Sequence, residues 1–327
     1  ASTDLVHISK PVADLAQSLN WQPVAIYGHV KNTIETEWSW GCRKSPEETL
    51  RQKSGNSCEQ AVLLASLLRA AGFPTRLVRA NIEFFASDGK PIELVKNLTG
   101  IDDPAKIAEF FQKAGIPFKP IIQGGKISNF QIEHIYTESF IPYSNYRGAI
   151  LDEHGKTWLG LDTSIKTKDY VYNNPKDVFD QSGVGSQLSA IRDEYLSAIQ
   201  TQTPLEYLQS RINSELTTQN SQLAYNDFLR TKSLTPEPMK FLPASLQFKL
   251  VKVTGEYTEI PGELIHEVRF LATRDAQLAT PLFDITLPLY RLSNQQIALT
   301  YGPETVEDQE IINSYGGLDN TPSYLVR

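Results

Sequence analysis

The sequence predicts a mixed protein of the α+β class. Its strongest helix is expected over residues 58–71, where nearly every position is apolar, as in a helix buried in a core. A strand is expected directly after it, over 75–84, and further strands over 131–141 and 157–162. Because a helix lies on one side of residue 75 and strands lie on the other, helices and strands belong to one α+β domain.

The remaining elements follow in order along the chain. Short helices are expected over 4–20 and 23–37, ahead of the strong helix. An insertion over 87–128 holds one amphipathic helix, 103–114, between loops marked by Gly and Pro. Residues 175–232 then turn helical and polar, which predicts a helical segment.

A boundary is expected near residues 236–238, where two prolines flank a glutamate. Beyond it, residues 246–253 and 267–273 alternate as strands. The sequence therefore predicts an α+β domain followed by a helical extension and a small β-rich C-terminal module, over 1–175, 176–238 and 239–327.

Composition excludes several function classes. The 31 Lys and Arg against 38 Asp and Glu give a net charge of −7 without a basic run, which argues against nucleic acid or an anionic membrane as partner. No stretch of about 18 apolar residues occurs, so no membrane span is expected. Five scattered His residues and two Cys lack metal-ligand spacing, so we expect neither a metal nor a cofactor.

Cys58 is the candidate nucleophile. Either Asn56 with Glu59 or Ser57 with Gln60 fits a capping box, and each choice puts Cys58 in the first turn of the buried helix. First-turn N–H groups lack intrahelical partners and face the positive end of the dipole, which makes a thiol there more acidic. Its own N–H can also donate to an oxyanion. The alternative is that Cys58 is only a small core residue.

His134 is the candidate base, and Asp162 is the acid that would orient it. His134 lies inside a strand-like run, where a histidine is more often structural than catalytic. If strands 131–141 and 157–162 pair, the two side chains meet across the ladder. The carboxylate would then fix the tautomer of the imidazole and stabilise the imidazolium.

Further residues are candidates for supporting roles. Gln52 and Asn56 are both possible second oxyanion donors, and the sequence does not choose between them. Trp38, Trp40 and Tyr136 are expected at the substrate cleft, with buried aromatic packing as the alternative for the two tryptophans.

Cys42 has basic neighbours but precedes no buried helix, and we interpret it as a structural or free thiol. Two cysteines are too few for a disulfide scaffold. A disulfide between Cys42 and Cys58 is conceivable, however, and it would mask the nucleophile.

Taken together, three segments resemble the transglutaminase-like superfamily: residues 55–78, 134–142 and 158–164. The most specific part is the end of the helix, which consists of Leu67, Leu68, Arg69 and Ala70 followed by Gly72, Pro74 and Arg76. The resemblance covers roughly residues 25–165. It implies a papain-like cysteine-protease fold, with the buried helix packed on an antiparallel sheet, and a catalytic triad of Cys58, His134 and Asp162.

Two positions depart from the family pattern. Asp162 is followed by Thr and Ser where the family commonly has Pro and Thr, and Tyr136 stands where it usually has Trp. Some relatives also lack the Cys.

The chain is most similar to bacterial transglutaminase-like proteins associated with RHS-repeat proteins, on segments 98–101, 124–127 and 242–246. That likeness implies a secreted or extracytoplasmic, multidomain protein. Its implied partners are a protein or peptide substrate and further domains or an RHS-type protein.

Two functions follow. The first is thiol-dependent amide acyl transfer, in which water as acceptor makes a peptidase, amidase or deamidase and an amine makes a cross-linking transglutaminase. The second is a catalytically silent binding or scaffold module. A Cys58 sulfur near the His134 ring and open to solvent would favour the enzyme, whereas an occluded or distant sulfur would favour the scaffold.

Overall fold

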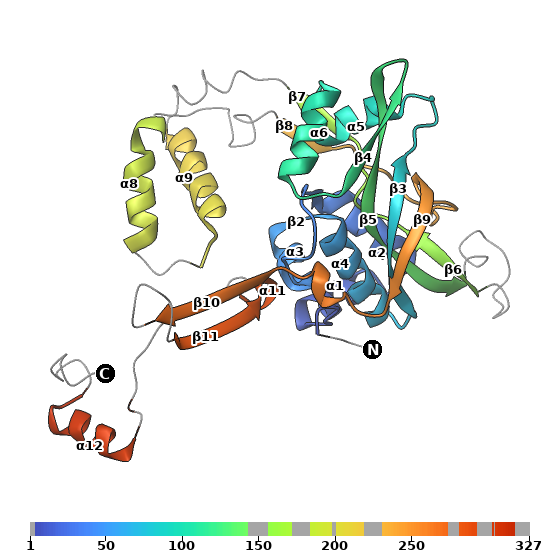
Figure 1. Ribbon diagram of the computed structural model, residues 1–327. Coiled ribbons are helices and arrows are strands. Elements are labelled where there is room, and N and C mark those ends of the chain that lie inside the picture. Colours follow the sequence, from blue (N-terminus) through green and yellow to red (C-terminus); the bar gives the residue numbers. More distant parts are fainter. Residues whose placement is uncertain are drawn as a thin grey trace. The chain divides into compact units, whose positions relative to one another are not determined.

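The computed structural model describes residues 4–142, 156–171, 184–197, 201–218, 231–273, 281–292, 303 and 305–317 (Figure 1). The chain divides into two compact units, 1–294 and 295–327. In the second unit the described helix is α12, Val306–Ser314, which begins with a capping box formed by Thr305 and Asp308.

The helices of the first unit precede, interrupt and follow its strands. Their bounds are α1 Lys10–Ser18, α2 Pro23–Thr33, α3 Pro46–Gln52, α4 Ser57–Ala70, α5 Pro91–Thr99, α6 Pro104–Lys113, α8 Val184–Ser197, α9 Pro204–Thr218 and α11 Leu289–Leu292, with a short 3-10 turn η3 at Gly262–Leu264. Helix α4 confirms the strong helix expected over 58–71. Helix α6 confirms the helix of the insertion, whereas α5 was not expected.

The first unit contains one antiparallel sheet of five strands (Figure 1). Its strands are β4 Phe118–Gln123, β5 Lys126–Pro142, β3 Thr75–Phe84, β9 Phe248–Tyr257 and β6 Lys156–Leu161. Strand β3 lies between β5 and β9, and β5 pairs with β3 along one edge. The other edge of β5 pairs with β4 in its first half and with β6 in its second half. This mixture of helices with a curled antiparallel sheet agrees with the predicted α+β class.

The other strands of the described residues form three two-stranded sheets. They are β1 Glu35–Thr36 with β2 Ser54–Gly55 in parallel, β7 Lys168–Val171 with β8 Thr231–Leu234, and β10 Glu267–Thr273 with β11 Pro281–Pro288. The first pair joins the loop after α2 to the residues just before α4. It therefore helps to place the beginning of that helix.

The two faces of the sheet carry different helices. Alternate residues of a strand point to opposite faces, and Leu77 and Ile135 pack with Ala61 and Val62 of α4. The neighbouring Val78 lies in a separate cluster with residues of α5 and α6. Helix α4 thus covers one face while the insertion covers the other, and the burial of α4 on nearly all sides explains its apolar sequence.

Strand β9 differs from the expected C-terminal module. Residues 248–257 pair with β3 along most of its length, so this segment is part of the central sheet rather than of a separate module that begins at 239. The sequence pattern identified a strand here, but alternation alone does not say which strand is its neighbour. The strand expected over 267–273 is present as β10.

Candidate functional site

His134 of β5 and Asp162, the residue after β6, lie next to each other. Thr137 of β5 pairs with Leu161, the last residue of β6. Asp162 therefore follows directly after β6 and lies on the same side of β5 as the His134 side chain. The Nε2 atom of His134 lies 3.0 Å from Oδ1 of Asp162, and both side chains are buried. Since Nε2 faces the carboxylate as a donor, Nδ1 is the ring nitrogen left to accept a proton.

Asp162 is held as an anion by several donors. Ser164 Oγ donates to Oδ1 at 2.9 Å, and the N–H of Ile165 donates to Oδ2 at 3.1 Å. Burial by itself would raise the pKa of Asp162, but the charge and hydrogen bond of His134, with Lys31 nearby, hold this pKa well below its usual value. The carboxylate is therefore ionised at neutral pH and can orient the imidazole.

Strand β9, which comes much later in the chain, also contacts the imidazole. The Phe248 ring packs edge-on against His134, with ring centroids 5.3 Å apart, and also against Tyr136 at 5.6 Å. A histidine clamped between a carboxylate and an aromatic ring has little freedom to rotate. Sequence reasoning missed Phe248 because it lies more than 100 residues downstream, in a segment assigned to another module.

A pocket opens where the first turn of α4 faces His134. Its wall combines apolar and polar side chains in similar numbers, namely Trp38, Trp40, Phe84, Ile116, Ile132 and Ile165 with Thr36, Glu37, Ser39, Ser57, Glu133, His134 and Ser164. The pocket therefore contains the candidate base and the partly buried Ser57. Cys58 does not line it.

Cys58 forms a disulfide with Cys42. Both sulfurs are buried, with 1% of Cys58 and none of Cys42 exposed. A sulfur in a disulfide carries no thiolate, so the expected accessible nucleophile at Cys58 is absent from this state of the protein. The disulfide that the sequence left open is present, and Cys42 is structural rather than free.

The position of Cys58 follows from strand and helix geometry. Cys58 packs in the same cluster as Ile135, whereas the preceding His134 points to the other face of β5. Successive residues of a helix are turned by about 100°, so Ser57 at the first helical position points elsewhere than Cys58. The capping box is formed by Asn56 with Glu59, one of the two choices that the sequence allowed.

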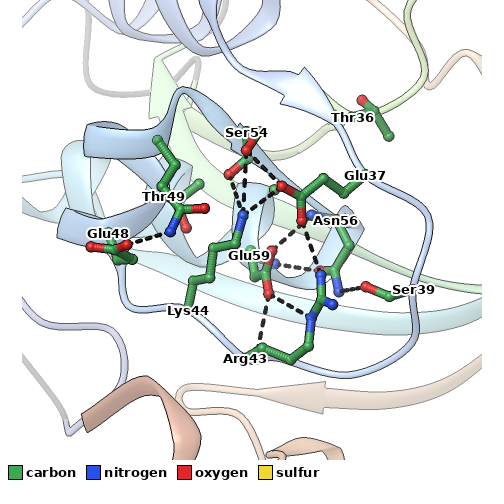
Figure 2. A network of polar contacts seen from close by, with 12 residues as sticks. Thr36, Glu37, Ser39, Arg43, Lys44, Glu48, Thr49, Ser54, Asn56 and Glu59 are labelled. Atoms are coloured by element: carbon green, nitrogen blue, oxygen red, sulfur yellow. Dashed lines mark hydrogen bonds and ion pairs between the residues drawn. The ribbon is translucent and has the colours of Figure 1, made fainter. Parts of the chain in front are cut away.

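A network of charged and polar side chains fixes the loop that carries Trp38 and Trp40 (Figure 2). Glu37 accepts hydrogen bonds from Lys44 and Ser54, each at 2.6 Å, and forms an ion pair with Arg43 at 2.9 Å. Burial would raise the pKa of Glu37, but these donors lower it overall. The backbone N–H of Arg43 also donates to the buried Glu59 of α4 at 3.1 Å. The loop and the start of α4 therefore form one rigid structure.

Gly41 allows this loop to pass close to the C-terminal part of the unit. Its φ is +74°, and a Cβ there would lie 2.9 Å from the carbonyl oxygen of Leu264 and from Nε2 of His266. The adjacent Cys42 donates its N–H to that carbonyl at 2.7 Å, while His266 Nε2 contacts the Trp40 carbonyl oxygen at 2.7 Å. A side chain at position 41 would separate these segments.

Both candidates for a second oxyanion donor are already engaged. Asn56 donates from Nδ2 to Ser39 Oγ at 2.9 Å and to the Gly41 carbonyl at 2.6 Å. Gln52 donates its amide to Glu48. Neither residue lines the pocket, so the expectation that one of them supplies an oxyanion donor is not supported.

Of the three cleft candidates, Trp38 and Trp40 line the pocket and Tyr136 does not. Tyr136 is buried, and its hydroxyl donates to Glu138 at 3.2 Å. The insertion holds Trp38, which donates its indole N–H to the Leu98 carbonyl at 3.3 Å. The rings of α6 pack against the same indole. The insertion therefore shapes the pocket.

In the part of the chain that the structure describes, no helix is both long enough and apolar enough to span a bilayer. The same residues contain no cluster of three or more His, Cys, Asp or Glu side chains suited to a metal ion.

The fold and the paired imidazole and carboxylate define a class: an α+β protein with a buried His–Asp pair at the end of a core helix. Residues 7–98 match the family model described as the Transglutaminase-like superfamily. The match includes the tryptophan loop, α4 and β3, and it ends before His134 and Asp162. It is compatible with acyl transfer and with a scaffold role. Searches of curated proteins and of solved structures gave no match.

Ser57 is the functional candidate that sequence reasoning missed. The sequence placed Cys58 in the first turn whichever capping box formed. A cysteine at that position already fits a nucleophile, so nothing in the sequence assigned that role to the neighbouring Ser57. Two signals pointed the other way: a second cysteine 16 residues upstream, and the choice of Asn56 as cap, which makes Ser57 the first helical residue. Neither signal fixes the direction of a side chain before the sheet is known.

Proposed function

We propose that this chain catalyses acyl transfer at the pocket beside His134, on an ester or on the carboxamide or peptide carbonyl of a protein or peptide substrate. The observation that carries the proposal is the 3.0 Å contact between His134 Nε2 and Asp162 Oδ1 at a pocket that faces the first turn of α4. A buried, oriented imidazole beside a helix N-terminus is the arrangement that general-base catalysis of acyl transfer needs.

Each part of the pocket has a role in such a reaction. His134, oriented by Asp162, takes a proton from the attacking group and returns it to the leaving group. The Asn56 cap binds the N–H of Glu59, which leaves the N–H groups of Ser57 and Cys58 in the first turn of α4 to stabilise the negative charge on the carbonyl oxygen. Water as acceptor gives hydrolysis or deamidation, and a primary amine gives cross-linking.

The test is mass-spectrometric profiling with and without a primary amine. The purified chain is incubated with esters, peptides and glutamine-containing peptides, and hydrolysis, ammonia loss and amine incorporation are recorded. We expect turnover in the wild type and a loss of roughly 10²–10⁴-fold in His134→Ala, because the general base is removed. A matched control is His29→Ala, which changes a histidine of α2 outside the pocket. Equal turnover in wild type and His134→Ala would refute the proposal.

A second candidate function is a binding or scaffold module without chemistry. The observation that favours it is the buried Cys42–Cys58 disulfide, because an occluded sulfur was the outcome expected of a silent relative. No turnover of any substrate under oxidising or reducing conditions would support this candidate over the enzyme.

The disulfide also supports a proposal on location. Disulfides form and persist in oxidising compartments, which is consistent with a secreted or extracytoplasmic protein. The likeness to bacterial RHS-associated proteins, and with it the multidomain context and an RHS-type partner, stays a prediction from the sequence. Purification with thiols blocked at lysis, followed by mass measurement of the Cys42–Cys58 peptide pair, tests whether the bond exists in cells.

A further inference from the structure

The nucleophile of this site is the open question that the disulfide raises. Acyl transfer through a covalent intermediate needs a nucleophilic side chain at the pocket that can pass its proton to His134. Thr36 lines the pocket, but its hydroxyl donates to the Ser164 carbonyl at 2.6 Å. The other candidates among the described residues are the hydroxyl groups of Ser39, Ser57 and Ser164, which also line the pocket, and the sulfur of Cys58, the residue after Ser57.

Three of the four are occupied. Ser164 donates to Asp162 at 2.9 Å and lies 3.3 Å from the Nε2 side of the imidazole, away from the free Nδ1. Ser39 accepts a hydrogen bond from Asn56 at 2.9 Å within the network that fixes the tryptophan loop. Cys58 is oxidised and packs with Ile135 on the opposite face of β5.

Ser57 differs from these three. It is the first residue of α4, it is partly buried, and it lines the pocket together with His134. Its backbone N–H is among the first-turn groups that have no partner inside the helix. One residue thus offers a hydroxyl at the pocket that contains the base, and an N–H at the start of the same helix that can stabilise an oxyanion.

We propose that Ser57 is the nucleophile of a Ser57–His134–Asp162 triad, an inference that rests on the proposed acyl transfer. As Nδ1 of His134 takes the hydroxyl proton, Oγ bonds to the substrate carbonyl carbon and the carbonyl electron pair moves to oxygen. The bond to the leaving alcohol or amine then breaks, and that group takes the proton from His134. Water hydrolyses the Ser57 ester, giving one proton to His134, which returns it to Oγ.

The pocket wall indicates the substrate class. Trp38, Trp40 and Ile116 give it apolar sides. Its two carboxylates are already paired, since Glu37 binds Lys44 and Arg43 and Glu133 binds Arg79. Among the described residues of the pocket wall, no unpaired carboxylate is left to recognise a cationic acyl group, and no Lys or Arg is present to recognise an anionic one. The acyl part of the substrate is therefore uncharged, carried as an ester or an amide.

The experiment uses the purified full chain with its disulfide intact. An alkyl fluorophosphonate is the covalent probe, and p-nitrophenyl acetate, butyrate, hexanoate and succinate are the substrates. We expect the probe to label Ser57, located by peptide mapping, and the neutral esters to react about 10-fold or more faster than the succinate ester. Ser57→Ala should lower turnover by roughly 10²–10⁴-fold and abolish labelling.

The control is the double variant Cys42→Ala with Cys58→Ala, which removes both sulfurs and leaves the triad. It should keep the turnover of the neutral esters within a few-fold of wild type. A second variant keeps the test valid if Ser57→Ala fails to fold. Ser57→Cys, made in the chain that carries Cys42→Ala and Cys58→Ala, should have more turnover than Ser57→Ala. Iodoacetamide should abolish this turnover, which should also require His134.

The outcomes separate the inference from the proposed function. Turnover that persists in Ser57→Ala but disappears in Cys58→Ala, and that requires a reductant, would overturn the serine assignment and leave acyl transfer intact. Turnover in no variant, with or without reductant, would refute acyl transfer and the serine together. Faster reaction of the succinate ester would overturn the substrate class.

Discussion

Asp162 is the residue on which the geometry of the site depends. It receives donors from His134, Ser164 and the N–H of Ile165, and its own carbonyl accepts the hydroxyl of Tyr27 at 2.7 Å. A buried carboxylate is costly unless such donors are present, and removing the charge would leave them without an acceptor. The same contacts that orient the imidazole therefore also stabilise the fold.

This gives a prediction for pH. The folded state holds the pKa of Asp162 below the value of 3.8 that an unperturbed carboxyl has. A group with a depressed folded pKa stabilises the protein above the unfolded pKa and loses that contribution as the pH falls. We expect the free energy of unfolding of wild type to exceed that of Asp162→Asn near neutral pH. The difference should shrink as the pH falls below 3.8.

Urea unfolding of both proteins across the acid range measures this difference. The matched control is Asp14→Asn, an exposed carboxylate of α1 paired only with Lys10, which should show almost no difference at any pH. A difference in the free energy of unfolding between wild type and Asp162→Asn that stays constant across the acid range would contradict the prediction.

At this scale the sequence located part of the site. Strand alternation and the expected pairing of two strands placed His134 and Asp162 together, and the pairing of β5 with β6 brings them to 3.0 Å. It did not distinguish Ser57 from Cys58, because neighbouring residues at a helix start differ only in direction. That direction depends on which residue caps the helix and on how the helix lies on the sheet.

At the scale of elements, the start of α4 is fixed by one side chain with two tasks. Asn56 accepts the N–H of Glu59 at 3.0 Å as the helix cap. Its amide nitrogen donates to Ser39 and to the Gly41 carbonyl. The cap therefore holds the helix and the tryptophan loop together, which is why the pocket wall lies beside the first turn.

Two substitutions separate these tasks. Asn56→Ala removes both. It should lower the free energy of unfolding by about 1 kcal/mol for the lost cap and by about 1–3 kcal/mol for the Gly41 carbonyl left without its donor. Asn56→Asp keeps a capping oxygen but loses both N–H donors, so we expect it to remain clearly destabilised. Urea unfolding gives both values. Ser45→Ala is the control, since Ser45 caps α3 through a single bond from Glu48 and should cost only about 1 kcal/mol. Wild-type stability of Asn56→Asp would show that capping is the only task.

At the scale of the whole molecule, the sheet joins segments that are far apart in the chain. Strand β9 pairs with β3, and its first residue, Phe248, packs on the imidazole and on Tyr136. Local patterns predicted helix α4 and the strands β3, β5, β6, β9 and β10. They did not predict that residues after 240 belong to the first sheet, because strand pairing over such distances depends on contacts that no short segment encodes.

The sheet topology leads to a prediction on truncation. A chain that ends at residue 238, the boundary expected from the sequence, lacks β9 and leaves one edge of β3 unpaired. Exposed strand edges and uncovered apolar side chains favour aggregation, so we expect this chain to lose cooperative thermal unfolding and to associate. A chain that ends at residue 294 keeps the whole first unit and should unfold cooperatively, as the full chain does.

Calorimetry and light scattering on the two truncated chains distinguish the cases. Cooperative unfolding of the chain ending at 238, with an unchanged His134 environment by NMR, would mean that the first part folds as an independent domain. In that case the contribution of Phe248 to the site would be dispensable. If only the longer chain folds, the imidazole depends for its orientation on a strand that begins 114 residues after it in the sequence. The site and the C-terminal part of the sheet then form a single cooperative unit.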